Sequence, residues 1–415
     1  MKVLNRIQSV KARKILDSRS DFTVETSIHT SLGTFTGSAP KGGSRGSGEA
    51  VELSAQAAVK SVNKKIAPKL AGKNLASQNE LDSFLVALDS SENKSNLGAN
   101  AILSVSIAGC RANAASKKKE LYSFLAELSG NKKLLLPVPF LNVLNGGKHA
   151  DLKNDVQEAM IVPVGFRSFS AALGASTAVF HSLRALLHKK WGASATLVGD
   201  EGGFVPHQAK TVEQRLELLE EAVENAGFSK KFAFAIDCAA TEFYNSKKKK
   251  YFLGKKAFSA GQLSDYYVRL VKSFHLVSIE DGFAQDDWDA WRFFTKKMGK
   301  KIQIIGDDLL VTNPARITQG IRLGSCNSLL LKPNQIGTVS ESIEAALLAK
   351  KAGWKVMVSH RSGETNDSFI ADLVVGLGFG QCKFGAPDRG ERIAKYNRLL
   401  QIEEELGKKA RFAKL

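Results

Sequence analysis

The 415-residue chain has few cysteines and no long apolar run, and each of these shortages excludes some classes of protein. Its cysteines, Cys110, Cys238, Cys326 and Cys382, lie far apart, so they predict neither a disulfide framework nor a CxxC metal site. No uncharged apolar run reaches the ~18 residues that a membrane-spanning helix needs. We therefore expect a protein of a reducing, cytoplasmic compartment that does not cross a membrane.

Acidic residues are also scarce, since 41 Asp and Glu face 59 Lys and Arg and leave a net charge of +18. This surplus favours nucleic acid, an anionic membrane surface or acidic small substrates as partners, or it is only a solvated coat. The lysines form short scattered runs, whereas a nucleic-acid arm would concentrate them, so the coat is preferred. The 43% apolar and 24% charged composition is globular, and the length suggests two or more domains.

The two ends of the chain carry weak resemblances to targeting signals. Residues 1–16 are basic without an acid, as transit peptides are, but the interspersed Val3, Ile7 and Val10 indicate a first strand instead. The final Ala413-Lys414-Leu415 is only loosely similar to a peroxisomal tripeptide. Three residues are weak evidence, so whether the C-terminal tripeptide is a signal stays open.

The first 130 residues predict an α+β domain. Alternating residues in 23–40 flank Ser31-Leu32-Gly33 and predict a hairpin. The glycine-rich stretch 40–48 predicts a mobile loop. Segments 49–69 and 100–115 have helical patterns, and the second is apolar on most sides, so we expect it to be buried.

Residues 131–415 have a different texture, in which short apolar runs alternate with helical stretches. The runs 134–144 and 159–164 are too close together for a helix between them and predict an antiparallel pair. A helix is predicted over 211–227, where Thr211 and Gln214 form a capping box.

Five apolar, strand-like runs each end in a side chain capable of chemistry, which is the most informative pattern in the sequence. These residues are Asp237, Glu280, Asp307, Lys332 and His360, at intervals of 43, 27, 25 and 28 residues. Such intervals accommodate a strand, a loop and a helix, so the pattern predicts successive βα units and a (β/α)8 barrel over 131–415. Reactive groups of such barrels meet at the C-terminal ends of the strands.

The residue types suggest a reaction class. Asp237, Glu280 and Asp307 offer hard oxygen ligands suited to Mg²⁺ and too carboxylate-rich for zinc. Lys332 is a potential base, which metal and cationic neighbours are expected to hold partly neutral. Glu201, after the apolar Leu197-Val198, is expected to face the same mouth as a candidate acid. A lysine and a glutamate across a divalent metal predict β-elimination or a related enolisation beside a carboxylate.

Ordered motifs along nearly the whole chain resemble the enolase family. They are ILDSR at 15–19, LGANAIL at 97–103, NVLNGG at 142–147 with His149, Gln157-Glu158, GDEGGF at 199–204, SIED at 278–281, AQDDW at 284–288, GDDL at 306–309, LLLKPNQIGT at 329–338, VSHRSGET at 358–365, and Lys383 with Gly385-Ala386-Pro387. Enolase-superfamily sites, with a Lys or His base and one or two Mg²⁺, are themselves a standard example of this chemistry. The resemblance implies reversible dehydration of 2-phospho-D-glycerate to phosphoenolpyruvate, in glycolysis and gluconeogenesis, with two Mg²⁺ per site.

The resemblance also implies a role for each matching residue. The catalytic set is Lys332 as base, Glu201 supported by Glu158 for loss of the C3 hydroxyl, and His360 beside the carboxylate and hydroxyl of the substrate. Substrate contacts are implied for His149, Gln157, Lys383 and the phosphate-binding Arg361 and Ser362. Metal ligands are implied to be Asp237, Glu280 and Asp307, with Ser44 on the closing glycine-rich loop for the second ion. Homodimers, and in some cases octamers, are the family's usual assemblies.

Four positions depart from the family pattern without removing a catalytic group. Arg45 replaces a usual Thr and places a cation where the second Mg²⁺ should arrive, and Gly282 replaces a usual Pro and loosens the strand end after Glu280-Asp281. Lys148 stands where small residues are common, and Gly390 replaces a usual Ser.

Two other functional readings remain open at this point. One is a different carboxylate-enolising enzyme of the superfamily. The predicted phosphate ligands Arg361 and Ser362 argue against it. The other is an enolase-like protein whose basic surface binds nucleic acid or another polyanion. The glycines at 376–380 imitate a nucleotide fingerprint, but packing is the better interpretation. The aromatic residues at 288–294 are likewise expected to pack a helix rather than stack bases.

Overall fold

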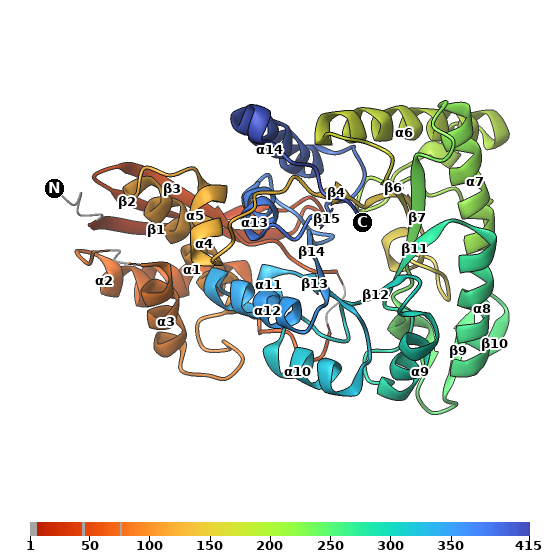
Figure 1. Cartoon of the computed structure of the whole chain (residues 1–415). Coiled ribbons are helices and arrows are strands. Elements are labelled where there is room, and N and C mark those ends of the chain that lie inside the picture. Colours follow the sequence, from red (N-terminus) through yellow and green to blue (C-terminus); the bar gives the residue numbers. More distant parts are fainter. Residues whose placement is uncertain (1–5, 44–45, 75–76) are drawn as a thin grey trace.

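The N-terminal part of the chain is a three-stranded antiparallel sheet covered by helices (Figure 1). The computed structural model describes residues 6–43, 46–74 and 77–415. Strands β1 (Ile7–Leu16), β2 (Phe22–Thr30) and β3 (Gly33–Ser38) pair in that order. The predicted first strand is confirmed from Ile7 on, while Val3 lies outside the described residues. The predicted hairpin is confirmed, with Thr30 pairing Gly33 across the turn.

Five α-helices and one π-helical turn follow this sheet. They are α1 (Ala55–Lys60), the π-helical Ser61–Ile66, α2 (Ala67–Leu70), α3 (Gln78–Asp89), α4 (Ala99–Ser116) and α5 (Leu121–Leu128). As predicted, α4 is buried along most of its length, against β2 and β3.

The helix predicted over 49–69 begins only at Ala55, so its first turn was wrong. The backbone N–H of Ala50 donates to Gln335 O and that of Val51 donates to Asn93 O, both at 2.8 Å. These tertiary bonds hold the segment extended against its helical propensity. Ser54 then caps the helix by accepting from the Ala57 N–H.

A nine-stranded sheet forms the barrel. Its strands are β4 (Val138–Pro139), β5 (Leu141–Asn145), β6 (Glu158–Pro163), β7 (Phe232–Asp237), β11 (Leu276–Glu280), β12 (Gln303–Gly306), β13 (Ser328–Leu331), β14 (Lys355–Ser359) and β15 (Gln381–Lys383). β4 pairs with β15 and β5 pairs with β6, so segment 138–145 closes the sheet, and its two pieces share one strand position. The expected barrel architecture is therefore confirmed.

The barrel begins antiparallel, as predicted. β6 runs antiparallel to both β5 and β7, whereas the pairs from β7 to β15 and β15 to β4 are parallel. Side chains fill the interior, among them Phe140, Met160, Ile305, Leu330 and Met357, so the barrel is a packed core.

Helices surround the barrel on the outside (Figure 1). They are α6 (Phe169–Trp191), α7 (Val212–Asn225), α8 (Ala260–Ser273), α9 (Trp288–Met298), α10 (Pro314–Leu323), α11 (Pro333–Ile336), α12 (Val339–Lys351), α13 (Phe369–Leu377) and α14 (Gly390–Leu406). A small sheet of β8 (Tyr244–Asn245), β9 (Lys250–Leu253) and β10 (Lys256–Phe258) is inserted after β7. The capping box of α7 at Thr211 and Gln214 is present as predicted.

The N-terminal part packs on the barrel beside α11, α12 and α13. Arg111 of α4 donates to both carboxylate oxygens of Asp367, at 2.8 and 2.6 Å, and Lys94 donates to Glu341 at 2.8 Å. These ion pairs fasten the helices of the first part to the barrel. The predicted domain boundary at 130/131 falls between α5 and β4 and stays a prediction.

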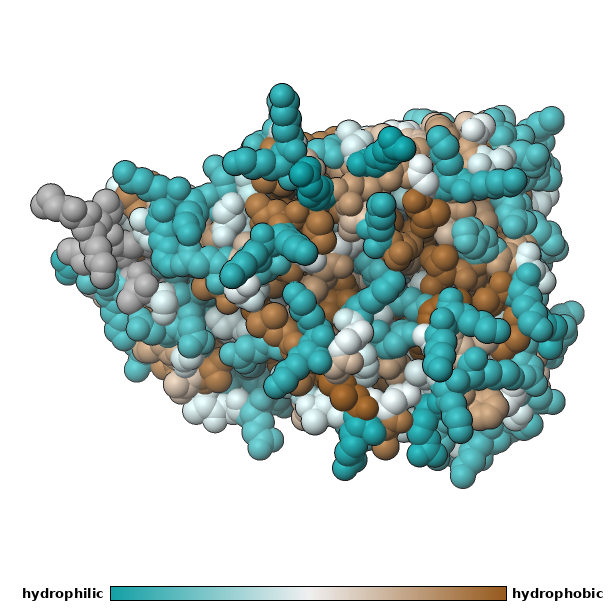
Figure 2. Space-filling view, in the orientation of Figure 1, coloured by the Kyte–Doolittle hydropathy of each residue, from teal (hydrophilic) through white to brown (hydrophobic). Residues whose placement is uncertain are grey.

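Charged side chains cover the surface in a dispersed way. Figure 2 shows hydrophilic residues spread over the whole visible face, with apolar patches between them. Some scattered lysines have acidic neighbours: Lys117 and Lys119 both pair with Glu127, and Lys297 pairs with Asp265. In α9, Trp291 and Phe294 are buried as expected, while Phe293 is exposed. Within the described ranges, no helix has both the length and the apolar character that crossing a bilayer requires.

Candidate active site at the barrel mouth

The predicted strand-end residues converge at one mouth of the barrel. Asp237 ends β7, Glu280 ends β11, and Asp307, Lys332 and His360 directly follow β12, β13 and β14. β6 runs in the opposite direction, so its first residue, Glu158, pairs in register with Asp237, the last residue of β7. The antiparallel start thus brings a further carboxylate to the same end.

Lys383, the last residue of β15, lies among three of these carboxylates. Its Nζ is 3.1 Å from Glu158 Oε2, 3.2 Å from Asp237 Oδ2 and 2.7 Å from Glu280 Oε1. Burial works to lower the pKa of this lysine, but the surrounding carboxylates outweigh it and raise the pKa well above the usual range. Lys383 is therefore a buried cation beside two predicted metal ligands.

Lys332 pairs with the third predicted metal ligand, Asp307, which also accepts from Gln335 Nε2 at 2.9 Å. Burial opposes the charge on Lys332, but Asp307 raises its pKa above the usual value. Among the side chains of the site, the contact with Asp307 therefore outweighs the cationic neighbours of Lys332, while the expected joint effect of a bound metal and these cations stays a prediction.

The donor set at the mouth fits a divalent cation of the Mg²⁺ type. Asp237, Glu280 and Asp307 offer carboxylate oxygens from three neighbouring strands, and Glu280 Oε2 is buried with no hydrogen-bond partner among the described residues. Burial raises the pKa of Glu280 well above its usual range, and Asp237 adds to this. A cation coordinated there would relieve both the orphaned oxygen and the repulsion.

Two groups of potential metal ligands have all their ligand atoms within 4.8 Å of one another. One consists of His149, Glu158 and Glu201, and the other of Asp281, Asp307 and Asp308. The Asp281 carboxylate already accepts from the backbone N–H groups of Asp307 at 2.9 Å and Asp308 at 2.8 Å. Asp281 therefore orients Asp307, a role that the sequence did not suggest.

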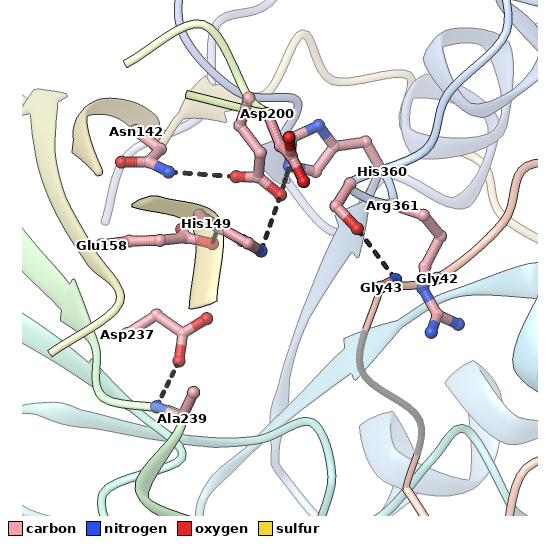
Figure 3. Close-up of polar contacts among 12 residues, drawn as sticks. Gly42, Gly43, Asn142, His149, Glu158, Asp200, Asp237, Ala239, His360 and Arg361 are labelled. Carbon is pink, nitrogen blue, oxygen red and sulfur yellow. Dashed lines mark hydrogen bonds and ion pairs between the residues drawn. The ribbon is translucent and has the colours of Figure 1, made fainter. Parts of the chain in front are cut away.

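Glu158, His149 and His360 lie together at the mouth (Figure 3), and Glu201 lies beside both histidines. Glu201 accepts from Asn142 Nδ2 at 3.0 Å, and His360 Nε2 lies 3.2 Å from Glu201 Oε1. His149 Nε2 is 3.8 Å from Glu201 Oε1, and its Nδ1 is 3.6 Å from Glu158 Oε1. These residues come from separate loops and strands, yet the structure brings them together.

The pKa values of Glu158 and Glu201 are shifted in opposite directions. Burial raises the pKa of Glu158 well above its usual range, and the charge of Glu201 adds to this. Burial also acts to raise the pKa of Glu201, but the neighbouring histidines and Lys383 outweigh it and lower the pKa well below the usual range. The surroundings therefore favour a proton on Glu158 over one on Glu201.

Leu197 and Val198, the apolar run that precedes the Glu201 loop, do not form a buried strand. Leu197 is 66% exposed, and Val198 makes only an isolated bridge to Phe204. Glu201 reaches the mouth from a loop because Gly199 N–H donates to Gly203 O at 2.8 Å and folds the glycine-rich motif back on itself.

Arg361 and Ser362 lie where the glycine-rich loop meets the barrel. Arg361 donates to the Glu49 carboxylate at 3.2 and 3.1 Å, and Ser362 Oγ accepts from the Gly43 N–H at 2.9 Å (Figure 3). A Cβ at Gly42 would lie 1.8 Å from Arg361 Nη2, so any side chain at this position would displace the guanidinium from its place. Glu49, which the sequence did not single out, is thus a partner of the predicted phosphate ligand.

Gln157 is buried beside the mouth, with its Oε1 lacking a hydrogen-bond partner in the described part of the chain. Its neighbour Asp155 accepts from both terminal nitrogens of Arg215 of α7, at 2.8 and 2.5 Å. This ion pair, also absent from the sequence-based list, holds the loop that carries His149.

Ser44 and Arg45 lie outside the described residues, so the predicted second metal ligand and its cationic neighbour stay predictions, as does the mobility of the loop. Gly282 is described, and a Cβ there would lie 3.3 Å from both Ile279 Cγ2 and Tyr267 Cε2. A side chain there would require a small shift of these neighbours, and the looser strand end expected from Gly282 stays a prediction.

Comparison with known proteins agrees with this geometry. The chain matches the family description "Enolase, N-terminal domain" over residues 7–125 and "Enolase, C-terminal TIM barrel domain" over residues 133–415. It is 50% identical over 432 aligned positions to a protein of Solanum lycopersicum named "Enolase", with 98% of this chain and 97% of that protein covered. The chain therefore belongs to the enolase family.

Proposed function

We propose that the protein is a Mg²⁺-dependent carbon–oxygen lyase that reversibly dehydrates 2-phospho-D-glycerate to phosphoenolpyruvate, and so acts in glycolysis and gluconeogenesis. The observation that carries the proposal is one barrel mouth shared by a lysine, a pair of glutamates beside two histidines, and a carboxylate cluster. Membership of the enolase family supports the same reaction.

The chemistry divides between the two sides of the substrate. Lys332 Nζ, as a neutral amine, accepts the proton from C2 and becomes an ammonium, and the electrons of that C–H bond form the new C2–C3 double bond. The hydroxyl on C3 leaves as water with the proton held by Glu158 and Glu201. General acid and base groups of this kind each contribute about 10² to 10⁴ in rate.

Asp237, Glu280 and Asp307 would hold a divalent cation, which when bound supplies positive charge next to the substrate carboxylate. Arg361 and Ser362 bind the phosphate, while His149, Gln157, His360 and Lys383 line the remaining faces of the substrate. Ser44 is assigned to a second Mg²⁺ on the family pattern alone.

The assembly is proposed to be a homodimer, with an octamer as the alternative, in the cytoplasm. Leu16 and Phe22 pair across β1 and β2 and are 58% and 55% exposed, which favours a protein contact at that edge. Light scattering should give twice the 44.9 kDa chain mass. A mass equal to one chain would refute the dimer.

The reaction is tested by adding 2-phosphoglycerate and Mg²⁺ and following the ultraviolet absorbance of phosphoenolpyruvate. We expect product formation that stops on adding a chelator and resumes with excess Mg²⁺. No product, or turnover that the chelator leaves unchanged, would refute the proposal.

A further inference from the structure

A buried arginine outside the predicted site reaches into it from the first turn of α14. The Arg392 side chain is fully buried, and its two terminal nitrogens make four contacts. Nη1 lies 2.7 Å from His360 Nδ1 and donates to Arg361 O at 2.5 Å. Nη2 donates to Ser362 O at 2.6 Å and to Asp200 O at 3.1 Å.

These contacts use every hydrogen on the two terminal nitrogens. Each of them carries two N–H groups, and each meets two acceptors. The four acceptors belong to two segments: residues 360–362, which include the predicted phosphate ligands, and Asp200, which precedes the acid Glu201. One side chain therefore fixes both segments relative to each other.

The contact with His360 also determines where that imidazole carries its proton. A guanidinium has no acceptor and stays charged, so His360 Nδ1 must be the acceptor. The proton of a neutral imidazole then lies on Nε2, which is 3.2 Å from Glu201 Oε1. Burial lowers the pKa of His360 to about 3, in agreement with a neutral ring.

We propose that Arg392 is a positioning residue that holds His360 as the Nε2–H tautomer facing Glu201 and fixes the backbone of the Arg361-Ser362 phosphate segment. Its effect on turnover rests on the proposed function, whereas the tautomer does not. Lysine cannot substitute, because one ammonium offers three hydrogens from a single point where four acceptors in two directions must be met.

Nitrogen-15 NMR of histidine-labelled protein tests the tautomer directly. At pH 7 we expect His360, assigned by the loss of its signals in His360→Asn, to show a protonated Nε2 and an unprotonated Nδ1. Arg392→Met should produce a mixture of tautomers or a charged ring. A wild-type Nδ1–H tautomer or imidazolium, or an unchanged His360 in Arg392→Met, would overturn the proposal.

Arg398, on the same helix, provides a matched control. It pairs with Asp372 at 3.0 and 2.8 Å and makes none of the contacts to residues 360–362 described above. Arg398→Met should lose stability yet leave the His360 signals unchanged. If Arg392→Met fails to fold, the nitrogen-15 spectra are recorded on Arg392→Lys instead. His360 should again show a mixture of tautomers or a charged ring.

Kinetics add a second readout. Loss of a group that orients a histidine typically costs about 10- to 100-fold, so kcat of Arg392→Lys should fall by that factor and KM should rise. Normal kcat and KM in a folded Arg392→Lys would contradict the positioning role. A wild-type protein without turnover would refute the proposed function instead, and the spectra would still decide the tautomer.

Discussion

Replacing Lys332 with alanine separates the loss of a base from the loss of a buried ion pair. The change removes the proposed C2 base and also the ammonium that contacts Asp307. The first effect should lower turnover by about 10² to 10⁴. The second leaves a buried carboxylate without its cation, which costs roughly 3 to 5 kcal/mol of stability when such a pair is broken.

Lys94 provides a control for the second effect. It is also buried and pairs with Glu341 at 2.8 Å, but it lies between the N-terminal helices and the barrel, away from the mouth. Lys94→Ala should therefore lose stability in a urea titration and keep its turnover. Lys332→Ala should lose both.

The assay is phosphoenolpyruvate absorbance, measured at a temperature where circular dichroism shows both variants to be folded. Turnover of Lys332→Ala within tenfold of Lys94→Ala would refute Lys332 as the base. Equal losses of turnover in the two variants would show that ion-pair loss, rather than loss of a base, explains the effect.

Gly42→Ala should raise KM more than it lowers kcat, because a Cβ there would displace Arg361; an unchanged KM would contradict the phosphate assignment. Asp367→Ala should lower the free energy of unfolding by roughly 3 to 5 kcal/mol, since Arg111 would lose its buried partner, and urea denaturation measures this. The pKa of His360 is lowered to about 3 in the folded protein from 6.5, so the unfolded chain binds more protons between these values and stability falls as pH drops below 6.5. Denaturation at pH 7 and pH 5 should show a smaller fall for His360→Asn than for wild type, and equal falls would contradict a buried neutral ring.

The periodic part of the fold was predictable because the signal is local. Apolar strand runs before Asp307, Lys332 and His360, at intervals of 25 and 28 residues, predict βα units, and the barrel follows from the number and order of these units. The short link between 134–144 and 159–164 likewise forces the antiparallel start. The prediction of a first helical turn within 49–69 was wrong because the Val51 N–H donates to Asn93 O. No local pattern reveals a hydrogen bond to a residue so distant in sequence.

The site was predictable as a set of residues but not as a set of contacts. Family motifs name Lys383 and Lys332, whereas their places against Glu280 and Asp307 depend on how the strands close into a barrel. Contacts with neighbouring charges, rather than burial, set the sign of the pKa shift of Lys332, and no local sequence pattern reveals those contacts.

Arg392 was missed because it carries no motif. One signal was available: Arg392 and Lys395 occupy the buried face of α14 together with Tyr396 and Leu399, an unusual place for cations. Lys395 Nζ contacts Glu364 Oε2 at 2.8 Å, so both basic residues reach the segment that follows β14. A cation within the apolar stripe of a helix is therefore worth testing as a positioning group.

Exchange of the C2 proton of 2-phosphoglycerate with deuterium from the solvent, followed by proton NMR in the presence of Mg²⁺, tests the central claim most directly. If Lys332 removes that proton and the Glu158–Glu201 pair acts afterwards on the hydroxyl, Glu201→Gln should still exchange C2 while forming little phosphoenolpyruvate. Lys332→Ala should do neither. Exchange in Lys332→Ala at the wild-type rate, or its loss in a folded Glu201→Gln, would contradict this division of roles.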